Sequence, residues 1–226
     1  MKEAPITIGD RRELFVDSYL IERMENVRQA LHAPQPREVS LVCDKPWEGC
    51  MGAFNTVVTH QGRHRLYYRG WHMRLEGFDG GSASRPPTIC LAESADGVHW
   101  ERAAVNRFDY GGSRANNIVW MGTGDDGWGM HGFSPFVDTN PACPPDQRWK
   151  AVGGGWRDPS KGLYVMASPD GVTWRLLSET PILAGYPHDS HNTVLWSAEE
   201  GCYRAYFRIF TRERVRTIAT ATSPDL

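Results

Sequence analysis

The sequence has little that would place the protein in a membrane or on nucleic acid. None of its 226 residues lies in an apolar run long enough to span a bilayer, and residues 1–10 lack the apolar centre of a secretory signal. Lys and Arg number 25 against 27 Asp and Glu, a net charge of −2, which predicts no basic surface for nucleic acid. These absences predict a cytoplasmic protein that binds neither membranes nor nucleic acid. They leave the oligomeric state open.

Several common kinds of site are also missing. The five cysteines include no Cys-x-x-Cys pair, and their odd number argues against a zinc site or a complete disulfide framework. The chain has no Gly-x-Ser-x-Gly elbow and no Walker-type phosphate loop. We therefore predict no metal site and no cofactor, and no catalysis by a nucleophilic serine or cysteine.

What the sequence does contain is a short motif that recurs. Residues 94–100 read Ser-Ala-Asp-Gly-Val-His-Trp, residues 168–174 read Ser-Pro-Asp-Gly-Val-Thr-Trp, and residues 223–226 begin a third copy. In such a turn the Ser and Asp side chains bind backbone N–H groups, and Gly permits a positive φ. The Trp side chain then packs between neighbouring sheets. Asp96 and Asp170 are therefore predicted to be structural and not catalytic.

Strand-like segments with alternating, β-branched or aromatic residues precede each copy of the motif. They are residues 54–58, 65–69 and 87–92, then 133–137, 148–152 and 162–167, then 191–195, 203–208 and 216–221. Four antiparallel strands in a repeated unit are typical of a β-propeller blade. The fold class is thus predicted to be all-β, with equivalent first strands beginning at Asn55, Ser134 and Asn192. Insertions at 122–129 and 140–146 explain the unequal spacing.

The predicted organisation is a lead-in over residues 1–46 followed by a partial propeller over residues 47–226. The three blades cover approximately residues 47–110, 111–182 and 183–226. Within the lead-in, residues 14–24 fit a short helix or a strand followed by a turn, and residues 32–52 read as a proline-rich extended stretch. A propeller closes only with a full ring of blades, so three blades predict a longer protein that continues with about two more.

The turn motif resembles the Ser-x-Asp-(Gly/Leu)-x-x-Trp turn of five-bladed propeller glycoside hydrolases, the invertase- and arabinanase-like families. The sialidase Asp-box differs, because one residue separates its Asp and Gly. The runs Leu-Phe-Val-Asp-Ser-Tyr-Leu-Ile-Glu at 14–22, Lys-Pro-Trp-Glu-Gly at 45–49 and Asn-Asn-Ile-Val at 116–119 resemble uncharacterised bacterial members of that superfamily. The resemblance covers most of residues 12–226. It implies a five-bladed propeller that acts on carbohydrate.

The chain departs from those families at their catalytic motifs. It has no Asn-Asp-Pro-Asn-Gly motif on the first blade. Residues 157–159 match the letters of the Arg-Asp-Pro motif that carries a second acid, but they fall in a turn between two strands of the second blade. We therefore do not assign the second-acid role to Asp158.

Ligands of propellers bind where the first strands begin near the central axis, and glycoside hydrolysis generally needs two carboxyl groups there. Glu48 and Asp189 precede the first strands of different blades and are the predicted catalytic pair, with Asp17 as a third candidate. Each has a structural alternative, which is an ion pair for Glu48 and Asp189 and a turn or helix cap for Asp17. The sequence leaves open whether the reaction retains or inverts the anomeric configuration.

Substrate-binding residues are predicted at the same end of the blades. Trp47 would give a stacking wall beside Glu48. The others are Asn55, Arg69, His131, Ser134, His188, His191, Asn192 and Arg208. Arg69 and Arg208 occupy matching places, where they would clamp a carboxylate or a pair of hydroxyls, or else pair with an acid of the next blade. The histidines match no established metal motif, although an axial calcium ion, found in some related propellers, stays an alternative.

The sequence as a whole predicts a glycoside hydrolase that acts on an oligosaccharide or polysaccharide by acid/base chemistry at the axial funnel. The first alternative is a propeller that binds glycans or proteins without catalysis. A degenerate or incomplete enzyme is the second alternative.

Overall fold

The computed structural model describes residues 5–10, 13–72, 87–123, 127–155 and 162–226. The chain divides into two units, Met1–Glu38 and Val39–Leu226. The described residues of the first unit form turns, bends and backbone without regular secondary structure, so residues 14–24 are neither the helix nor the strand that the sequence allowed. Leu14 and Val16 are exposed there, and a short helix without a packed apolar face is marginal in water.

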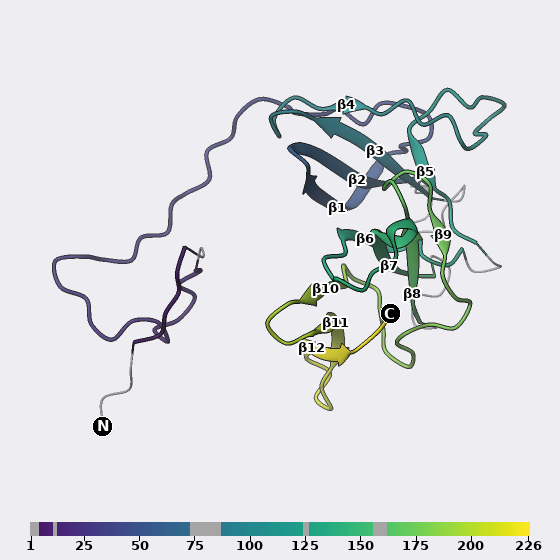
Figure 1. Ribbon diagram of the computed structural model, residues 1–226. Coiled ribbons are helices and arrows are strands. Elements are labelled where there is room, and N and C mark those ends of the chain that lie inside the picture. The colour runs from purple at the N-terminus through teal and green to yellow at the C-terminus, as the bar shows by residue number, and fades with distance from the viewer. Residues whose placement is uncertain (1–4, 11–12, 73–86, 124–126, 156–161) are drawn as a thin grey trace. The chain divides into compact units, whose positions relative to one another are not determined.

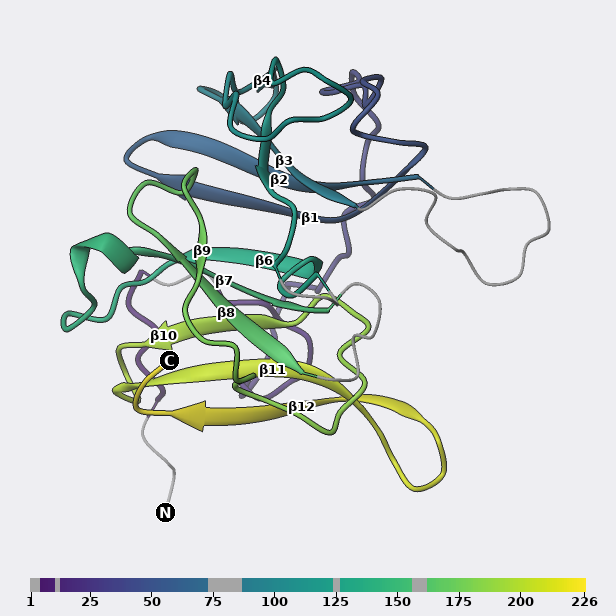
Figure 2. The same ribbon diagram turned by 90° about the vertical axis from the view of Figure 1, so that its right-hand side faces the viewer.

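The second unit contains three antiparallel sheets in its described part (Figures 1 and 2). The first sheet is formed by β1 (Met51–His60), β2 (Arg63–Trp71), β3 (Thr88–Ser94) and β4 (Glu101–Arg102), and β5 (Ile118–Trp120) also pairs with β3. The second is formed by β6 (His131–Val137), β7 (Trp149–Gly154), β8 (Leu163–Ser168) and β9 (Arg175–Leu176), with a 3-10 turn at Pro145–Gln147. The third is formed by β10 (Thr193–Ser197), β11 (Cys202–Phe210) and β12 (Arg216–Ser223).

Apart from β5, which pairs with β3, strands that follow one another along the chain are neighbours in each sheet, and this confirms the predicted all-β architecture of antiparallel blades. Both views show the sheets stacked in chain order, with the second between the first and the third. Buried apolar side chains fill both interfaces, so the unit has one cluster between the first and second sheets and another between the second and third. No helix in the described part of the chain has the length and apolar character needed to cross a membrane.

The first strands of two sheets carry the same irregularity. Ala53 pairs with Arg69 and Thr56 with Tyr67, so β1 has one more residue than its partner over this stretch. His131 pairs with Gly154 and Ser134 with Val152, which is the same bulge in β6. A bulge shifts the register of a strand by one residue. The observed pairing therefore makes Thr56, Ser134 and Thr193 the equivalent positions of the three first strands. The alternation of residue types had predicted Asn55, Ser134 and Asn192 instead.

The recurring turn has the geometry that its residues predict. Ser168 Oγ accepts the N–H groups of Asp170 and Gly171 at 3.2 and 2.8 Å, and Asp170 Oδ1 accepts those of Val172 and Thr173 at 2.8 and 2.7 Å. The same bonds recur in the turn at residues 94–99. Oδ1 of Asp96 and Oδ1 of Asp170 each hold the backbone of their turn, which is the structural role predicted for both aspartates.

Trp174, which ends the second turn, packs between the first two sheets. Its ring centroid lies 6.1 Å from that of Tyr67 on β2 and 5.1 Å from that of Phe133 on β6. The side chain is buried and its Nε1 donates to the carbonyl oxygen of Gly171 at 3.1 Å. The motif therefore ends one blade and joins it to its neighbour.

The two complete turns offer a matched test of how this joint depends on glycine. Gly97 and Gly171 have φ of +77° and +76°, so alanine at either costs roughly 1–2 kcal/mol of backbone strain. A Cβ at Gly97 would make ordinary contacts with His64 at 3.7 Å, whereas one at Gly171 would meet the Tyr67 hydroxyl at 2.7 Å and Trp149 Cδ2 at 2.9 Å. We expect Gly171→Ala to destabilise the protein by about 1–3 kcal/mol more than Gly97→Ala in urea unfolding. Equal losses would contradict this account of the joint.

Candidate functional site

Four of the predicted site residues lie together, on β2, on β6, on β11 and in the loop before β10. Arg69 Nη1 lies 3.3 Å from His131 Nδ1, and His131 Nε2 lies 2.9 Å from Asp189 Oδ1. Arg208 Nη1 approaches Asp189 Oδ2 at 3.5 Å, and its Nε donates to the carbonyl oxygen of Pro187 at 3.0 Å. Residues of all three sheets thus contribute to one polar cluster, which we call the Asp189 cluster: Arg69, His131, Asp189 and Arg208.

A glycine allows the loop that carries Asp189 to reach this position. Gly132, next to His131 on β6, has a φ of +65°, and a Cβ there would lie 2.5 Å from the carbonyl oxygen of Ser190. A residue with a side chain would therefore push the loop away from β6. The bulge in β6 places this glycine, so the irregularity of the strand and the position of the carboxylate have one cause.

The contacts of His131 define which of its ring nitrogens carries the proton. A guanidinium group only donates hydrogen bonds, so Nδ1 must accept the bond from Arg69. The proton of the neutral ring is then on Nε2, which donates to Asp189 Oδ1. Burial, together with the charge of Arg69, lowers the pKa of His131, which favours the neutral ring. The chain of bonds therefore runs in one direction, from Arg69 through His131 to the carboxylate.

The cluster is buried except for its carboxylate. Arg69, Arg208 and His131 are 4%, 6% and 9% exposed, whereas 54% of the Asp189 side chain is accessible. Within the cluster, one carboxylate faces two guanidinium groups. Burial lowers the pKa of Arg69 to about 10, and the charge of Asp189 only partly offsets this effect. The site therefore combines an accessible carboxylate with buried positive charge.

Two aromatic rings lie close to the Arg69 guanidinium group. Its central carbon lies 4.7 Å from the centroid of Phe54 and 4.4 Å from that of Trp71. Its Nε is buried without a hydrogen-bond partner in the described structure. Each ring contributes about 0.5–2 kcal/mol, while burial of an ion costs several kcal/mol. The rings therefore offset only part of the cost of burying this charge.

Further predicted residues surround the cluster or hold its loop. His191 Nε2 lies 3.1 Å from Thr56 Oγ1, and the Phe54 ring centroid is 5.9 Å from that of His191. Asn192 Nδ2 donates to the carbonyl oxygens of His188 and Ser190, both at 3.0 Å, which ties the loop before β10 together. His188 is fully buried and packs against the Phe207 ring at 6.0 Å. These contacts place His191 beside the cluster and give Asn192 and His188 supporting positions.

The remaining predicted binding residues on the first strands differ in exposure. Ser134 is buried, whereas Asn55 is exposed on β1 beside Thr56. The bulge explains why the sequence pointed to Asn55 and missed Thr56, because one extra residue exchanges the side chains on the two faces of a strand. Phe54 and Trp71 were also missed. Nothing in the local pattern distinguishes them from ordinary core aromatics.

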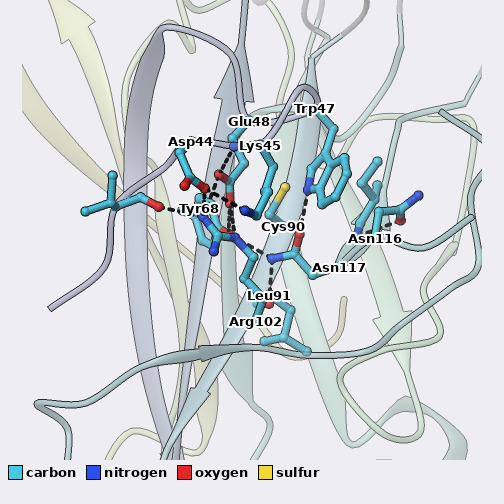
Figure 3. A network of polar contacts seen from close by, with 12 residues as sticks. Asp44, Lys45, Trp47, Glu48, Tyr68, Cys90, Leu91, Arg102, Asn116 and Asn117 are labelled. Carbon is cyan, nitrogen blue, oxygen red and sulfur yellow. Dashed lines mark hydrogen bonds and ion pairs between the residues drawn. The ribbon is translucent and has the colours of Figure 1, made fainter. Parts of the chain in front are cut away.

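Glu48 lies in a different polar network, which Figure 3 shows. Its Oε1 accepts the Tyr68 hydroxyl at 2.6 Å and Arg102 Nε at 2.8 Å. Its Oε2 accepts Arg102 Nη2 and the backbone N–H of Lys45, both at 2.9 Å. The residue is 1% exposed. Neighbouring Trp47 donates from Nε1 to Asn117 Oδ1 at 2.7 Å in the same network.

This network holds Glu48 as a charged group in the interior. Burial alone would raise its pKa, but the bonds from Arg102, Tyr68 and the Lys45 backbone outweigh it, and the pKa of Glu48 is lowered. A general acid needs the opposite shift, because it must keep its proton near neutral pH. The contacts therefore support the ion-pair alternative for Glu48, with Arg102 as the partner that the sequence did not indicate.

Asp17 belongs to the first unit, whose residues are described by themselves. Its Oδ1 accepts the backbone N–H of Tyr19 at 2.9 Å, and the residue is exposed. This is the turn-capping contact that the sequence gave as the alternative for Asp17. Residues 157–159 lie outside the described residues. No group of three or more His, Cys, Asp or Glu side chains that would hold a metal ion occurs in the part of the chain that the structure describes.

Comparison with known proteins adds to this geometry at the level of the fold. Neither a protein-family model nor a curated protein matches the sequence. Among solved structures, the chain is similar to one from work on the GH130 family of mannoside phosphorylases, which contains glycoside hydrolases that target β-1,2-mannosidic linkages in Candida mannan. That match has a TM-score of 0.51 and 14% identity, and it covers 79% of this chain and 47% of the other.

A glycosyl hydrolase from Bacteroides ovatus is similar to the same extent. The TM-score is 0.50 at 12% identity, over 79% of this chain and 47% of that protein. Together with the stacked antiparallel sheets, these similarities show that the chain has a β-propeller fold like that of these structures, with three blades in its described part. The chain spans about half the length of these structures.

Proposed function

We propose that the protein is a carbohydrate-active propeller, a glycoside hydrolase in which Asp189 supplies one of the two carboxyl groups. The observation that carries the proposal is the half-exposed carboxylate of Asp189, held by His131 and Arg208 where strands of three blades meet. The solved structures with the same fold include a glycosyl hydrolase. They support a carbohydrate as the substrate class. The assignment of the site residues is argued from the contacts within this chain alone.

The contacts of Asp189 suit a base or a nucleophile. Both of its oxygens face donors, His131 Nε2–H and the Arg208 guanidinium, so the carboxylate is oriented as an acceptor. In an inverting reaction it would take a proton from the attacking water. In a retaining reaction it would attack the anomeric carbon directly. His131, which is neutral and bonded on both nitrogens, orients the carboxylate in either case.

The second carboxyl group would protonate the leaving oxygen. Of the other two candidates, Glu48 is better explained as the centre of a buried ion-pair network, because all four of its bonds stabilise the charged form. Asp17 caps a turn in the other unit of the chain, so it is not assigned the acid either. The proposal therefore assigns the base or nucleophile to Asp189, and it assigns the acid to neither of the other two candidates.

A substrate screen tests the proposal. Purified protein is incubated with aryl glycosides, with plant and algal oligosaccharides and with β-1,2-mannosides, and released sugar and binding are measured in parallel. We expect release of sugar from at least one substrate class. Binding without hydrolysis in every arm would overturn the enzyme proposal in favour of a non-catalytic glycan-binding propeller.

A further inference from the structure

The charge balance of the Asp189 cluster suggests which sugars the site accepts. We propose that the site binds a sugar with a carboxylate group, a uronic acid, and that Arg69 and Arg208 bind that carboxylate. The inference rests on the proposed carbohydrate function, but it concerns binding and does not require hydrolysis. It makes Arg69 and Arg208 the residues that determine specificity.

The first argument is that positive charge in the cluster exceeds negative charge. The groups that act on one another there are Arg69, Arg208, His131 and Asp189. The bond that His131 Nδ1 accepts from Arg69 requires an unprotonated Nδ1, and burial and the Arg69 charge lower the pKa of the ring, so the neutral form is favoured. His191 and His188 stand next to them, and burial lowers the pKa of each below its ordinary value. Among the described residues of the cluster, two buried cations therefore face one carboxylate, and a singly charged anion would complete the balance.

The second argument is that both guanidinium groups have donors to spare. Arg69 gives Nη1 to His131, but its buried Nε has no partner in the described structure. Arg208 gives Nε to Pro187, and its Nη1 is 3.5 Å from Asp189, longer than a well-formed bond. A planar carboxylate matches the edge of a guanidinium group in geometry and charge.

The size of the charge distinguishes two sources of such an anion. A sugar carboxylate carries one negative charge, which matches the single excess positive charge of the cluster. A phosphate group carries about −1.5 to −2 near neutral pH and would exceed it beside the Asp189 carboxylate. A neutral sugar would leave the excess positive charge unbalanced. The cluster therefore favours the uronic acid over both.

Calorimetric titration of the full chain near neutral pH tests the inference. The ligands are D-glucuronate and D-galacturonate, each with its uncharged methyl ester, and inorganic phosphate. Hydrogen bonds to charged groups correspond to about 10- to 100-fold in affinity, and we expect at least one uronate to bind tighter than its ester by that factor. Equal binding of acid and ester, or binding of phosphate without either uronate, would overturn the inference.

Variants assign the effect to the two arginines. Arg69→Met and Arg208→Met are each expected to remove the preference for the acid, and Arg208→Lys, which keeps the charge, to retain part of it. Arg208 and Arg216 both lie over the Phe210 ring, at 5.2 and 5.9 Å. Arg216→Met is therefore the matched control, because Arg216 is exposed and outside the cluster. Circular dichroism verifies that each variant is folded. A preference that survives in both folded Met variants would refute the assignment.

The two proposals fail in different ways. If the screen finds hydrolysis but uronates bind no better than their esters, the enzyme proposal stands and the uronate inference falls. If uronates bind through both arginines but no substrate is cleaved, the binding inference stands and the hydrolase proposal falls.

Discussion

Asp189→Asn is expected to lower kcat by about 10²- to 10⁴-fold on any substrate that the protein hydrolyses, the range by which a positioned acid or base contributes. The amide oxygen of Asn can still accept the bond from His131 Nε2, so the loop and the ring should keep their places. The amide can neither take a proton from water nor attack an anomeric carbon effectively. Hydrolysis should therefore fall while sugar binding is largely kept.

Asp146→Asn provides the matched control for this change. Asp146 is an exposed aspartate that pairs with Arg175 at 2.7 Å, away from the Asp189 cluster. We expect its kcat to equal that of the unchanged protein, and thermal unfolding compares the stability of both variants. An Asp189→Asn protein that is folded and hydrolyses at the unchanged rate would remove Asp189 from the mechanism.

Glu48→Gln is expected to destabilise the protein by about 3–5 kcal/mol, the usual effect of breaking a buried ion pair from one side. The substitution removes the charge that offsets Arg102 and turns one of the two acceptor oxygens into a donor facing its former donors. The midpoint of urea unfolding measures the loss. Asp44→Asn is the control, since Asp44 bonds the same Arg102 at 2.9 Å from an exposed position, and little change is expected there.

The same network makes stability depend on pH in a definite direction. The pKa of Glu48 in the folded protein lies below its ordinary value of 4.5, so its contribution to stability is fully present above that pH. It is lost as the pH falls through the lowered value, because the unfolded chain then binds the proton more readily. When the pH is lowered from neutral to 4 or below, the free energy of unfolding should fall further in the unchanged protein than in Glu48→Gln. Parallel losses would show that Glu48 carries no such linkage.

The turn motif was readable because its contacts are local. Ser168, Asp170 and Gly171 bond to backbone groups within three residues of themselves, so their spacing along the chain almost determines the geometry. From three such turns and the strands before them, the order of strands in each blade also follows. The bulge at Phe54 and Gly132 was not readable, because it changes the register without changing the alternation of residue types.

The two predicted catalytic carboxylates also show what the sequence could not predict at the site. Glu48 and Asp189 look alike in sequence, since each lies shortly before a first strand in a polar and aromatic segment. In the structure, Arg102 reaches Glu48 from a strand 54 residues away and makes it part of the interior. Asp189 meets His131 across a gap of 58 residues and stays accessible. Their environments differ because of partners that are distant in the sequence.

By itself, the sequence determined the all-β class, the repeated blade and the structural role of the turn aspartates, because each follows from periodicity and from bonds between near neighbours. Only the tertiary structure decided which carboxylate is buried in an ion pair and which is presented beside two arginines. The burial of a charged group and the identity of its partner depend on how whole sheets stack. No local pattern of residues encodes that arrangement.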